Sequence, residues 1–151
     1  MSRYGNHNFS GTPLFEHFSK FRSGFWDIVK LHMSKRILIL DDNQDILDIV
    51  HETLSYEQFD VKSTSESIDV IPMVEEFEPN LVILDYRVSG TNGGELCRQI
   101  KSHPKYKDVP VIIFSAYVNL ADELSAYGCD AIINKPFDLT ELVEKVNLLI
   151  K

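Results

Sequence analysis

Ile37-Leu38-Ile39-Leu40-Asp41-Asp42 joins a short apolar run to two carboxylates, and this arrangement recurs along the chain. Three later apolar runs also end in polar residues, and they read LVILD (81–85), VIIFS (111–115) and AIINKP (131–136). Short, wholly apolar runs are typical of strands that are buried on both faces of a parallel sheet. Helical patterns lie between the runs, so the sequence predicts an α/β fold, in which ligands bind at the carboxyl ends of the strands.

From Lys35 onward the pattern alternates between strands and helices in five units. The expected strands lie at about 36–40, 59–62, 81–84, 111–114 and 131–133. The first expected helix has Ile46, Ile49, Val50 and Leu54 on a single face. Three more helices are expected near 67–77, 95–102 and 120–127. The apolar face of the last helix is formed by Leu142, Val146, Leu149 and Ile150. Asp138 and Glu141 have the spacing of a capping box at the start of the last helix, and Gly128 is expected just after a helix end.

Composition and charge narrow the classes of function. Hydrophobic residues make up 44% of the 151 residues and charged residues 25%, as in ordinary globular domains. The net charge of −8 disfavours a nucleic-acid partner. The histidines and cysteines lack zinc-ligand spacing, and no apolar run approaches the ~18 residues that cross a bilayer. Two cysteines without a CxxC spacing and the lack of a secretory signal predict a cytoplasmic protein without stable membrane association.

Residues 1–33 are interpreted as an N-terminal extension and residues 34–151 as the folded domain. The first thirteen residues are polar and are expected to be disordered, whereas apolar residues at spacings of three and four predict an amphipathic helix over 14–31. Three interpretations of this segment stay open. It packs on the domain or on a partner, it binds a membrane surface, or it is an artefact of a start codon assigned upstream of the true one. Few cations on the polar face make membrane binding the least favoured, and Met33 would itself be a natural start.

The polar residues at the predicted strand ends suit a metal and a phosphoryl group. Three carboxylates, Asp41, Asp42 and Asp85, would repel one another if their strands are neighbours, and a divalent cation removes that repulsion. A site with oxygen ligands alone suits Mg²⁺. Ser115 offers a hydroxyl, and Lys135 offers a point charge for phosphate. The peptide bond between Lys135 and the proline that follows it has access to the cis form. Singly, such residues are more often turn residues, helix N-caps or solvated side chains, but this explanation is weak for the set of carboxylates that each follow an apolar strand.

The chain from about Lys35 to Lys151 resembles the receiver domain of bacterial response regulators. The matching pieces are ILILDD (37–42), LVILD (81–85), IFSA (113–116) and NKPF (134–137), in this order. The resemblance implies a flavodoxin-like, doubly wound (βα)5 fold with a five-stranded parallel sheet in the order 2-1-3-4-5. It also implies a phosphoprotein of a two-component or phosphorelay system rather than an enzyme acting on a separate substrate.

The resemblance assigns roles to the strand-end residues. Asp85 would accept a phosphoryl group from a sensor histidine kinase or a phosphotransfer protein and become an aspartyl phosphate. Ser115 and Lys135 would then bind phosphoryl oxygens.

The resemblance also implies a ligand set for Mg²⁺. Asp42, Asp85 and the backbone carbonyl of Arg87 would bind the ion, and Asp41 would complete the cluster largely through water. Phosphoryl transfer needs positioning and charge neutralisation above all, which agrees with these roles.

Four positions depart from the family pattern or vary within it. Ile132 stands where receivers usually carry an aromatic residue, so the switching mechanism stays open, and Ser89 replaces a common proline. Arg87 and Tyr117 occupy variable positions near the pocket. We expect them to screen the phosphorus and to slow phosphate loss, although both side chains pointing into solvent is an equally good interpretation.

The leading interpretation is a phosphorylation-dependent switch without an attached output domain. Its downstream protein partner would bind the face formed by Leu120–Lys151, and the oligomeric state is open. The alternative is a pseudo-receiver that binds proteins independently of phosphorylation, which Ile132 favours weakly and the intact site residues oppose. An aspartate-based phosphatase is disfavoured by arginine at position 87, and a flavin carrier by the acidic loop Asp41–Gln44.

Overall fold

The computed structural model describes residues 24–25, 29, 33–66, 69–117, 119 and 121–151. The chain separates into two units, Met1–Met33 and Ser34–Lys151. The helix predicted over 14–31 falls for the most part outside the described residues and stays a prediction, as do the roles proposed for it. No helix among the described residues is long and apolar enough to cross a membrane.

Five parallel strands form the central sheet of the second unit. They are β1 (Arg36–Leu40), β2 (Asp60–Thr64), β3 (Leu81–Asp85), β6 (Val111–Ser115) and β7 (Ala131–Asn134). Their order in the sheet is β2-β1-β3-β6-β7, and every neighbouring pair is parallel. Counted along the chain, this is the predicted order 2-1-3-4-5, so the flavodoxin-like fold is confirmed.

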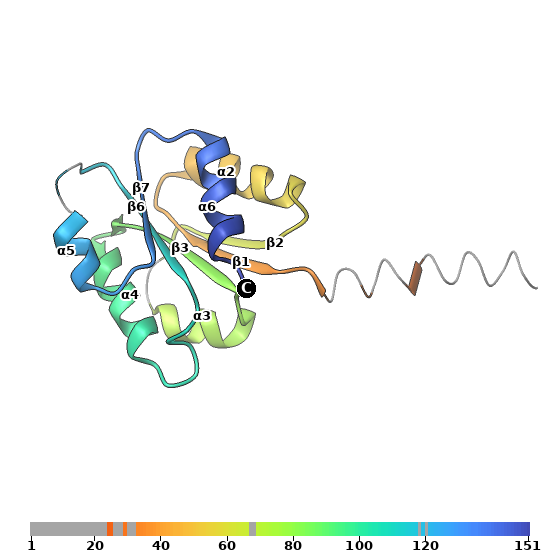
Figure 1. The fold of residues 1–151 in the computed structure, drawn as a ribbon, viewed down its shortest axis with the longest axis horizontal. Helices are drawn as coiled ribbons and strands as arrows, with labels where there is room; N and C mark the ends of the chain where they lie inside the picture. The colour runs from red at the N-terminus through yellow and green to blue at the C-terminus, as the bar shows by residue number, and fades with distance from the viewer. Residues whose placement is uncertain (1–23, 26–28, 30–32, 67–68, 118, 120) are drawn as a thin grey trace, which may run out of the picture. The chain divides into compact units, whose positions relative to one another are not determined.

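Five helices cover the two faces of this sheet. They are α2 (Gln44–Tyr56), α3 (Val70–Phe77), α4 (Gly93–Ser102), α5 (Ala121–Ala126) and α6 (Leu139–Leu149). Figure 1 shows α2 and α6 on one face and α3, α4 and α5 on the other. Because both faces are covered, a strand needs apolar side chains in both directions, which explains the uninterrupted apolar runs.

Alternate residues of each strand enter two separate apolar clusters. On β1, Leu38 and Leu40 pack with α3, α4 and α5, whereas Ile37 and Ile39 pack with α2 and α6, and all four are fully buried. Successive side chains of a strand point to opposite faces, so a single residue shift would exchange the two sets. The register of β1 is therefore fixed, and with it the position of the carboxylate that follows at Asp41.

The predicted face of α2 is partly wrong. Val50 and Leu54 are buried as expected, but Ile49 is 43% exposed and Leu47 takes its place in the core. Leu47, Val50 and Leu54 are three and four residues apart, which is the spacing of one helical face. Ile49 lies outside that face, and its apolar side chain at an exposed position led to the wrong assignment.

Helix caps explain most of the observed boundaries. α3 begins at Val70 rather than near 67, because the side chain of Asp69 caps the helix by accepting the N–H of Ile71 at 3.2 Å. Pro72 therefore lies in the first turn, where it is tolerated. The cap predicted at Asp138 is confirmed, since its Oδ1 accepts the N–H of Thr140 at 2.6 Å. Gly128 has a φ of +84°, as expected after a helix end.

A small hairpin between β3 and α4 was not predicted. Arg87–Val88 (β4) pairs with Thr91–Asn92 (β5) across a turn at Ser89 and Gly90, whose φ values are 47° and 80°. Two positive φ values in a two-residue loop are typical of a type I′ turn. Ser89 Oγ also donates to the carbonyl of Ser65 at 3.0 Å. Proline, whose φ is fixed near −65°, would not fit this turn, which accounts for serine here.

Candidate functional site

The carboxyl ends of four strands bring the predicted site residues together. Asp41 directly follows β1, Asp85 ends β3, Ser115 ends β6 and Lys135 directly follows β7. The strands pair as β1-β3-β6-β7, so these ends meet at one edge of the sheet. Ligands bind at this edge in open parallel sheets, as expected from the sequence.

Three carboxylates form a compact cluster at this edge. One carboxylate oxygen from each of Asp41, Asp42 and Asp85 lies within 4.8 Å of the others. Asp41 is fully buried, Asp85 is buried and Asp42 is exposed. Asp41 also serves the local turn, because its Oδ1 accepts the N–H of Asn43 at 2.9 Å. Carboxylate oxygens at this spacing, with one side open to water, fit a Mg²⁺ ion that keeps several water ligands.

The ammonium group of Lys135 bridges two of the three carboxylates. Its Nζ lies 2.7 Å from Oδ2 of Asp41 and 3.2 Å from Oδ1 of Asp85. The lysine side chain is only 17% exposed, so its charge is screened little by solvent. The peptide bond between Lys135 and Pro136 is cis. Lys135 thus supplies one positive charge to a site that holds three acids.

Asp85 has an unusual electrostatic environment. Burial raises the pKa of its carboxyl group above the ordinary value of 3.8, and the charges of Asp41 and then Asp42 raise it further. Lys135 opposes this by its charge and its hydrogen bond, but the net direction is upward. The ionised form of Asp85 is therefore held at a cost in free energy, and an added cation would lower that cost.

Ser115 is buried, and its hydroxyl forms hydrogen bonds with the backbone of the loop that follows it. Its Oγ accepts the N–H of Tyr117 at 3.0 Å and donates to the carbonyl oxygen of Tyr117 at 3.2 Å. The strand places Ser115 beside Asn134 of β7, at the same sheet edge as the carboxylates. The hydroxyl can reach a new acceptor by rotation about χ1.

Arg87 and Tyr117 contact each other above this edge. The guanidinium carbon of Arg87 lies 5.0 Å from the centre of the Tyr117 ring, a cation–π contact, and 44% of Tyr117 is exposed. The proposed role of the Arg87 carbonyl as a metal ligand stays a prediction.

Two residues beside the site were missed by the sequence analysis. Tyr86 packs edge-on against the ring of Tyr117, with ring centres 6.1 Å apart. Gly93, the first residue of α4, donates its N–H to the carbonyl of Tyr86 at 2.7 Å. A Cβ atom at position 93 would overlap the backbone carbonyl oxygen of Asp85. The cluster of glycines at 90, 93 and 94 was visible in the sequence, but the position that needs glycine was not.

Comparisons with known proteins agree with this fold. The sequence model of the response regulator receiver domain matches residues 37–147. The response regulator TrrA from Thermotoga maritima, solved in complex with Mg²⁺-BeF, is 31% identical, with 77% of this chain and 99% of that chain covered and a TM-score of 0.69. A CheY-like receiver domain protein from Methanospirillum hungatei is 30% identical, with 76% and 92% covered and a TM-score of 0.67.

A third solved structure, the chemotaxis response regulator CheY4 of Vibrio cholerae, is similar in fold. It is 18% identical, with 78% of this chain and 99% of that chain covered and a TM-score of 0.72. The family model spans well over half of the 151 residues. This chain therefore belongs to the response regulator receiver domain family, a family of signalling domains.

Proposed function

We propose that this chain takes up a phosphoryl group on Asp85, in a reaction that depends on Mg²⁺, and signals by a change of conformation. The observation that carries the proposal is the contact geometry of Asp85. Its carboxylate lies within 4.8 Å of two other carboxylates and 3.2 Å from the amine of Lys135. An aspartate that only ends a strand would not require two neighbouring carboxylates and an amine.

The donor in the proposed reaction is the phosphohistidine of a histidine kinase or a phosphotransfer protein. An oxygen of Asp85 attacks phosphorus, the bond between phosphorus and the imidazole nitrogen breaks, and that nitrogen takes a proton from solvent. Lys135 and Ser115 are proposed to bind two oxygens of the transferred group, the first as a point charge and the second as a hydroxyl donor. Lys135 already lies beside Asp85, so it needs little movement.

Mg²⁺ is proposed to bind Asp42, Asp85 and the backbone carbonyl of Arg87, with Asp41 joined largely through water. When bound, it would supply positive charge that offsets the negative charge of the transferring group. The chain's own contribution is a pre-formed cluster in which Asp41 is held by the N–H of Asn43 and by Lys135.

The proposal also covers the division of the chain and the downstream partner. Residues 34–151 are the receiver, and residues 1–33 are an N-terminal extension. The downstream partner is a protein that binds the face formed by α5, β7 and α6, where Leu148 of α6 is 83% exposed. Location in the cytoplasm and bacterial origin stay predictions.

Intact-mass measurement after treatment with Mg²⁺ and acetyl phosphate, a small phosphodonor, tests the proposal. We expect the native chain to gain one phosphoryl group, and Asp85→Asn or removal of Mg²⁺ by a chelator to abolish the gain. Asp45→Asn is the matched control, because Asp45 is an exposed acid in the first turn of α2 outside the cluster. An unmodified native chain would instead favour a pseudo-receiver that binds proteins without phosphorylation.

A further inference from the structure

The hydroxyl of Ser115 is tied to the backbone of Tyr117. Its Oγ donates to the Tyr117 carbonyl oxygen at 3.2 Å and accepts the Tyr117 N–H at 3.0 Å. A hydroxyl has a single proton, so Ser115 cannot donate both to this carbonyl and to a phosphoryl oxygen on Asp85. Rotation of the hydroxyl toward Asp85 therefore breaks the bond to the carbonyl and releases the backbone of Tyr117.

The ring of Tyr117 is in turn held by the segment that follows the phosphoacceptor. Tyr86 is the residue after Asp85, and its ring meets that of Tyr117 at an interplanar angle of 75° with centres 6.1 Å apart. Arg87, the next residue, places its guanidinium group 5.0 Å from the Tyr117 ring centre. Edge-to-face and cation–π contacts depend on ring orientation, so a shift of Tyr117 alters both.

Tyr86 connects this ring pair to α5. Its hydroxyl donates to Oε1 of Glu123 at 3.4 Å, and Glu123 lies in the first turn of α5. The phenol is the donor in this bond, because a carboxylate offers only acceptor oxygens. A chain of contacts thus runs from Ser115 through Tyr117 and Tyr86 to Glu123.

The residue three before Lys135 cannot provide such a connection through an aromatic ring. Ile132 has an aliphatic side chain that packs against the buried cluster under α3, α4 and α5. This side chain has neither a hydroxyl nor a π face, so it offers no directional contact that a movement of Ser115 could change. Among the described residues, Tyr86 and Tyr117 make ring contacts of this directional kind at the sheet edge.

We infer that Tyr86 and Tyr117 transmit phosphorylation of Asp85 to α5, in place of an aromatic residue at position 132. The relay rests on the proposed function. Ser115 rotates toward the phosphoryl group, Tyr117 is released, the ring pair reorients and the bond between Tyr86 and Glu123 is lost. Tyr86 and Tyr117 are positioning residues in this relay, and α5 is the element whose stability reports the phosphorylated state.

Hydrogen–deuterium exchange of the α5 amides in the full chain tests the relay, with and without Mg²⁺ and acetyl phosphate. Intact mass gives the extent of phosphorylation, and all variants are compared at equal extents. In the native chain we expect phosphorylation to increase the α5 exchange rate by about fivefold. This is the factor by which the loss of one net hydrogen bond changes an equilibrium. In Tyr86→Phe, which keeps the ring but loses the donor, this response should fall to near zero.

Two variants at position 117 separate ring contacts from the phenol. Tyr117→Ala removes the ring and should abolish the α5 response, whereas Tyr117→Phe keeps the ring and should respond like the native chain. Tyr56→Phe is the remote control, because Tyr56 is 82% exposed at the end of α2.

The outcomes separate failure of the relay from failure of the proposed function. A native chain that gains no phosphoryl group overturns the proposed function and the relay with it. A phosphorylated native chain whose α5 exchange does not change overturns the relay alone. An unchanged α5 response in Tyr86→Phe and Tyr117→Ala also overturns the relay alone, while loss of response in both at native extents of phosphorylation supports it.

Discussion

Lys135 and Asp41, which are 94 positions apart in the sequence, form an ion pair with Nζ 2.7 Å from Oδ2. The side chain of Asp41 is fully buried and that of Lys135 is 17% exposed. A buried carboxylate costs free energy unless a partner compensates for lost hydration, so Lys135 has a structural role in addition to the proposed binding of phosphate.

Removal of the lysine charge should therefore destabilise the domain. We expect Lys135→Met to lower the free energy of unfolding by about 3 kcal/mol in metal-free buffer, because two buried carboxylates lose their cation. Urea denaturation followed by circular dichroism measures the change. Lys105→Met is the matched control, because Lys105 forms an ion pair with Glu78 in which both side chains are more than half exposed, and equal losses in the two variants would contradict this role.

Asp85→Asn should have the opposite effect on stability. The pKa of Asp85 is raised above 3.8, so the folded state binds a proton more tightly than the unfolded state. The ionised carboxylate thus destabilises the fold at neutral pH, and this penalty disappears as the pH falls below the ordinary value. We expect Asp85→Asn to raise the urea midpoint at pH 7 without divalent cations.

The gain in Asp85→Asn should shrink as the pH falls through the raised pKa toward 3.8. Urea midpoints of both proteins across this range measure it. A gain that stayed constant down to acidic pH would show that the charge of Asp85 is not its cause.

Divalent metal should stabilise the native chain through the acidic cluster. At a Mg²⁺ concentration ten times the dissociation constant, binding adds about 1.4 kcal/mol to the free energy of unfolding. Asp42→Asn should reduce this gain, and thermal unfolding in a Mg²⁺ titration measures it. Asp45→Asn should keep the full gain, and a loss of equal size there would place the metal elsewhere.

Gly93→Ala should distort the segment that carries Asp85. Alanine usually stabilises a helix relative to glycine by about 1 kcal/mol, but here its Cβ would overlap the backbone carbonyl of Asp85. We expect a loss of about 1–3 kcal/mol in stability and weaker Mg²⁺ binding. Gly94→Ala is a useful comparison, because its Cβ would meet the ring of Tyr127 and not the backbone of Asp85. Unchanged Mg²⁺ affinity in Gly93→Ala would contradict the proposed coupling to Asp85.

Arg87 and Tyr117 should prolong the life of the phosphorylated state. Both side chains lie beside the strand ends, where we expect them to screen the phosphorus from water. We expect replacement of both by alanine to accelerate phosphate loss, measured by intact mass over time after removal of the phosphodonor. Arg98→Ala is the control, because Arg98 lies over the ring of Tyr127 on α4 instead, and an unchanged rate in the double variant would refute the screening role.

The sequence was most informative where buried strands end in polar residues. Runs such as Leu81–Leu84 are buried on both faces, so their pattern predicts both the strand and the position of the next side chain. Asp41, Asp85, Ser115 and Lys135 could be placed at one sheet edge for that reason. The pattern also predicted a parallel sheet, whereas the order of the strands in that sheet came from the family resemblance.

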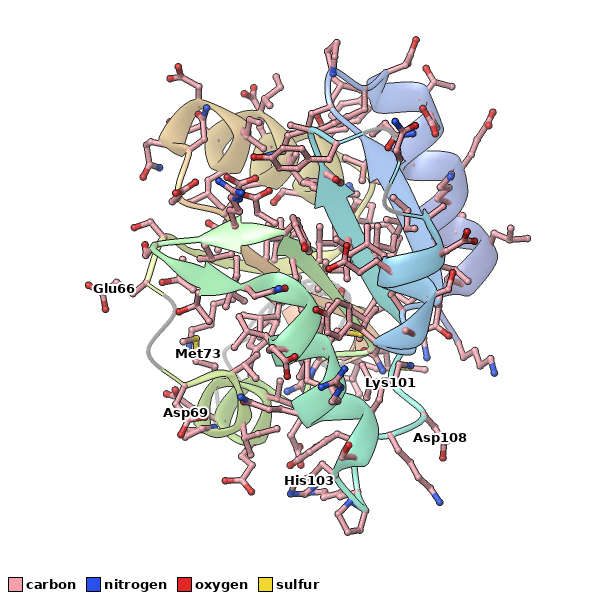
Figure 2. All side chains as sticks on the ribbon, turned by 90° about the vertical axis from the view of Figure 1, so that its left-hand side faces the viewer. Glu66, Asp69, Met73, Lys101, His103 and Asp108 are labelled. Atoms are coloured by element: carbon pink, nitrogen blue, oxygen red, sulfur yellow. The ribbon has the colours of Figure 1, made fainter. Side chains whose placement is uncertain are left out.

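Features that depend on distant contacts could not be predicted. The exposure of Ile49 depends on how α2 rotates against the sheet, and a helical pattern alone leaves that rotation uncertain by one position. The ring pair of Tyr86 and Tyr117 joins residues 31 positions apart in two loops, which have no periodicity to read. Other long-range contacts are similar, such as the ion pair at 2.7 Å between Asp130 and Lys101. Figure 2 labels Lys101.

The measurement that tests the central proposal most directly is the location of the phosphoryl group. The chain is treated with Mg²⁺ and acetyl phosphate, reduced with borohydride, which converts an aspartyl phosphate to homoserine, and sequenced by peptide mass spectrometry. The proposal predicts homoserine at position 85 and nowhere else. Unchanged aspartate at position 85, or modification at Asp41 or Asp42 in its place, would contradict it.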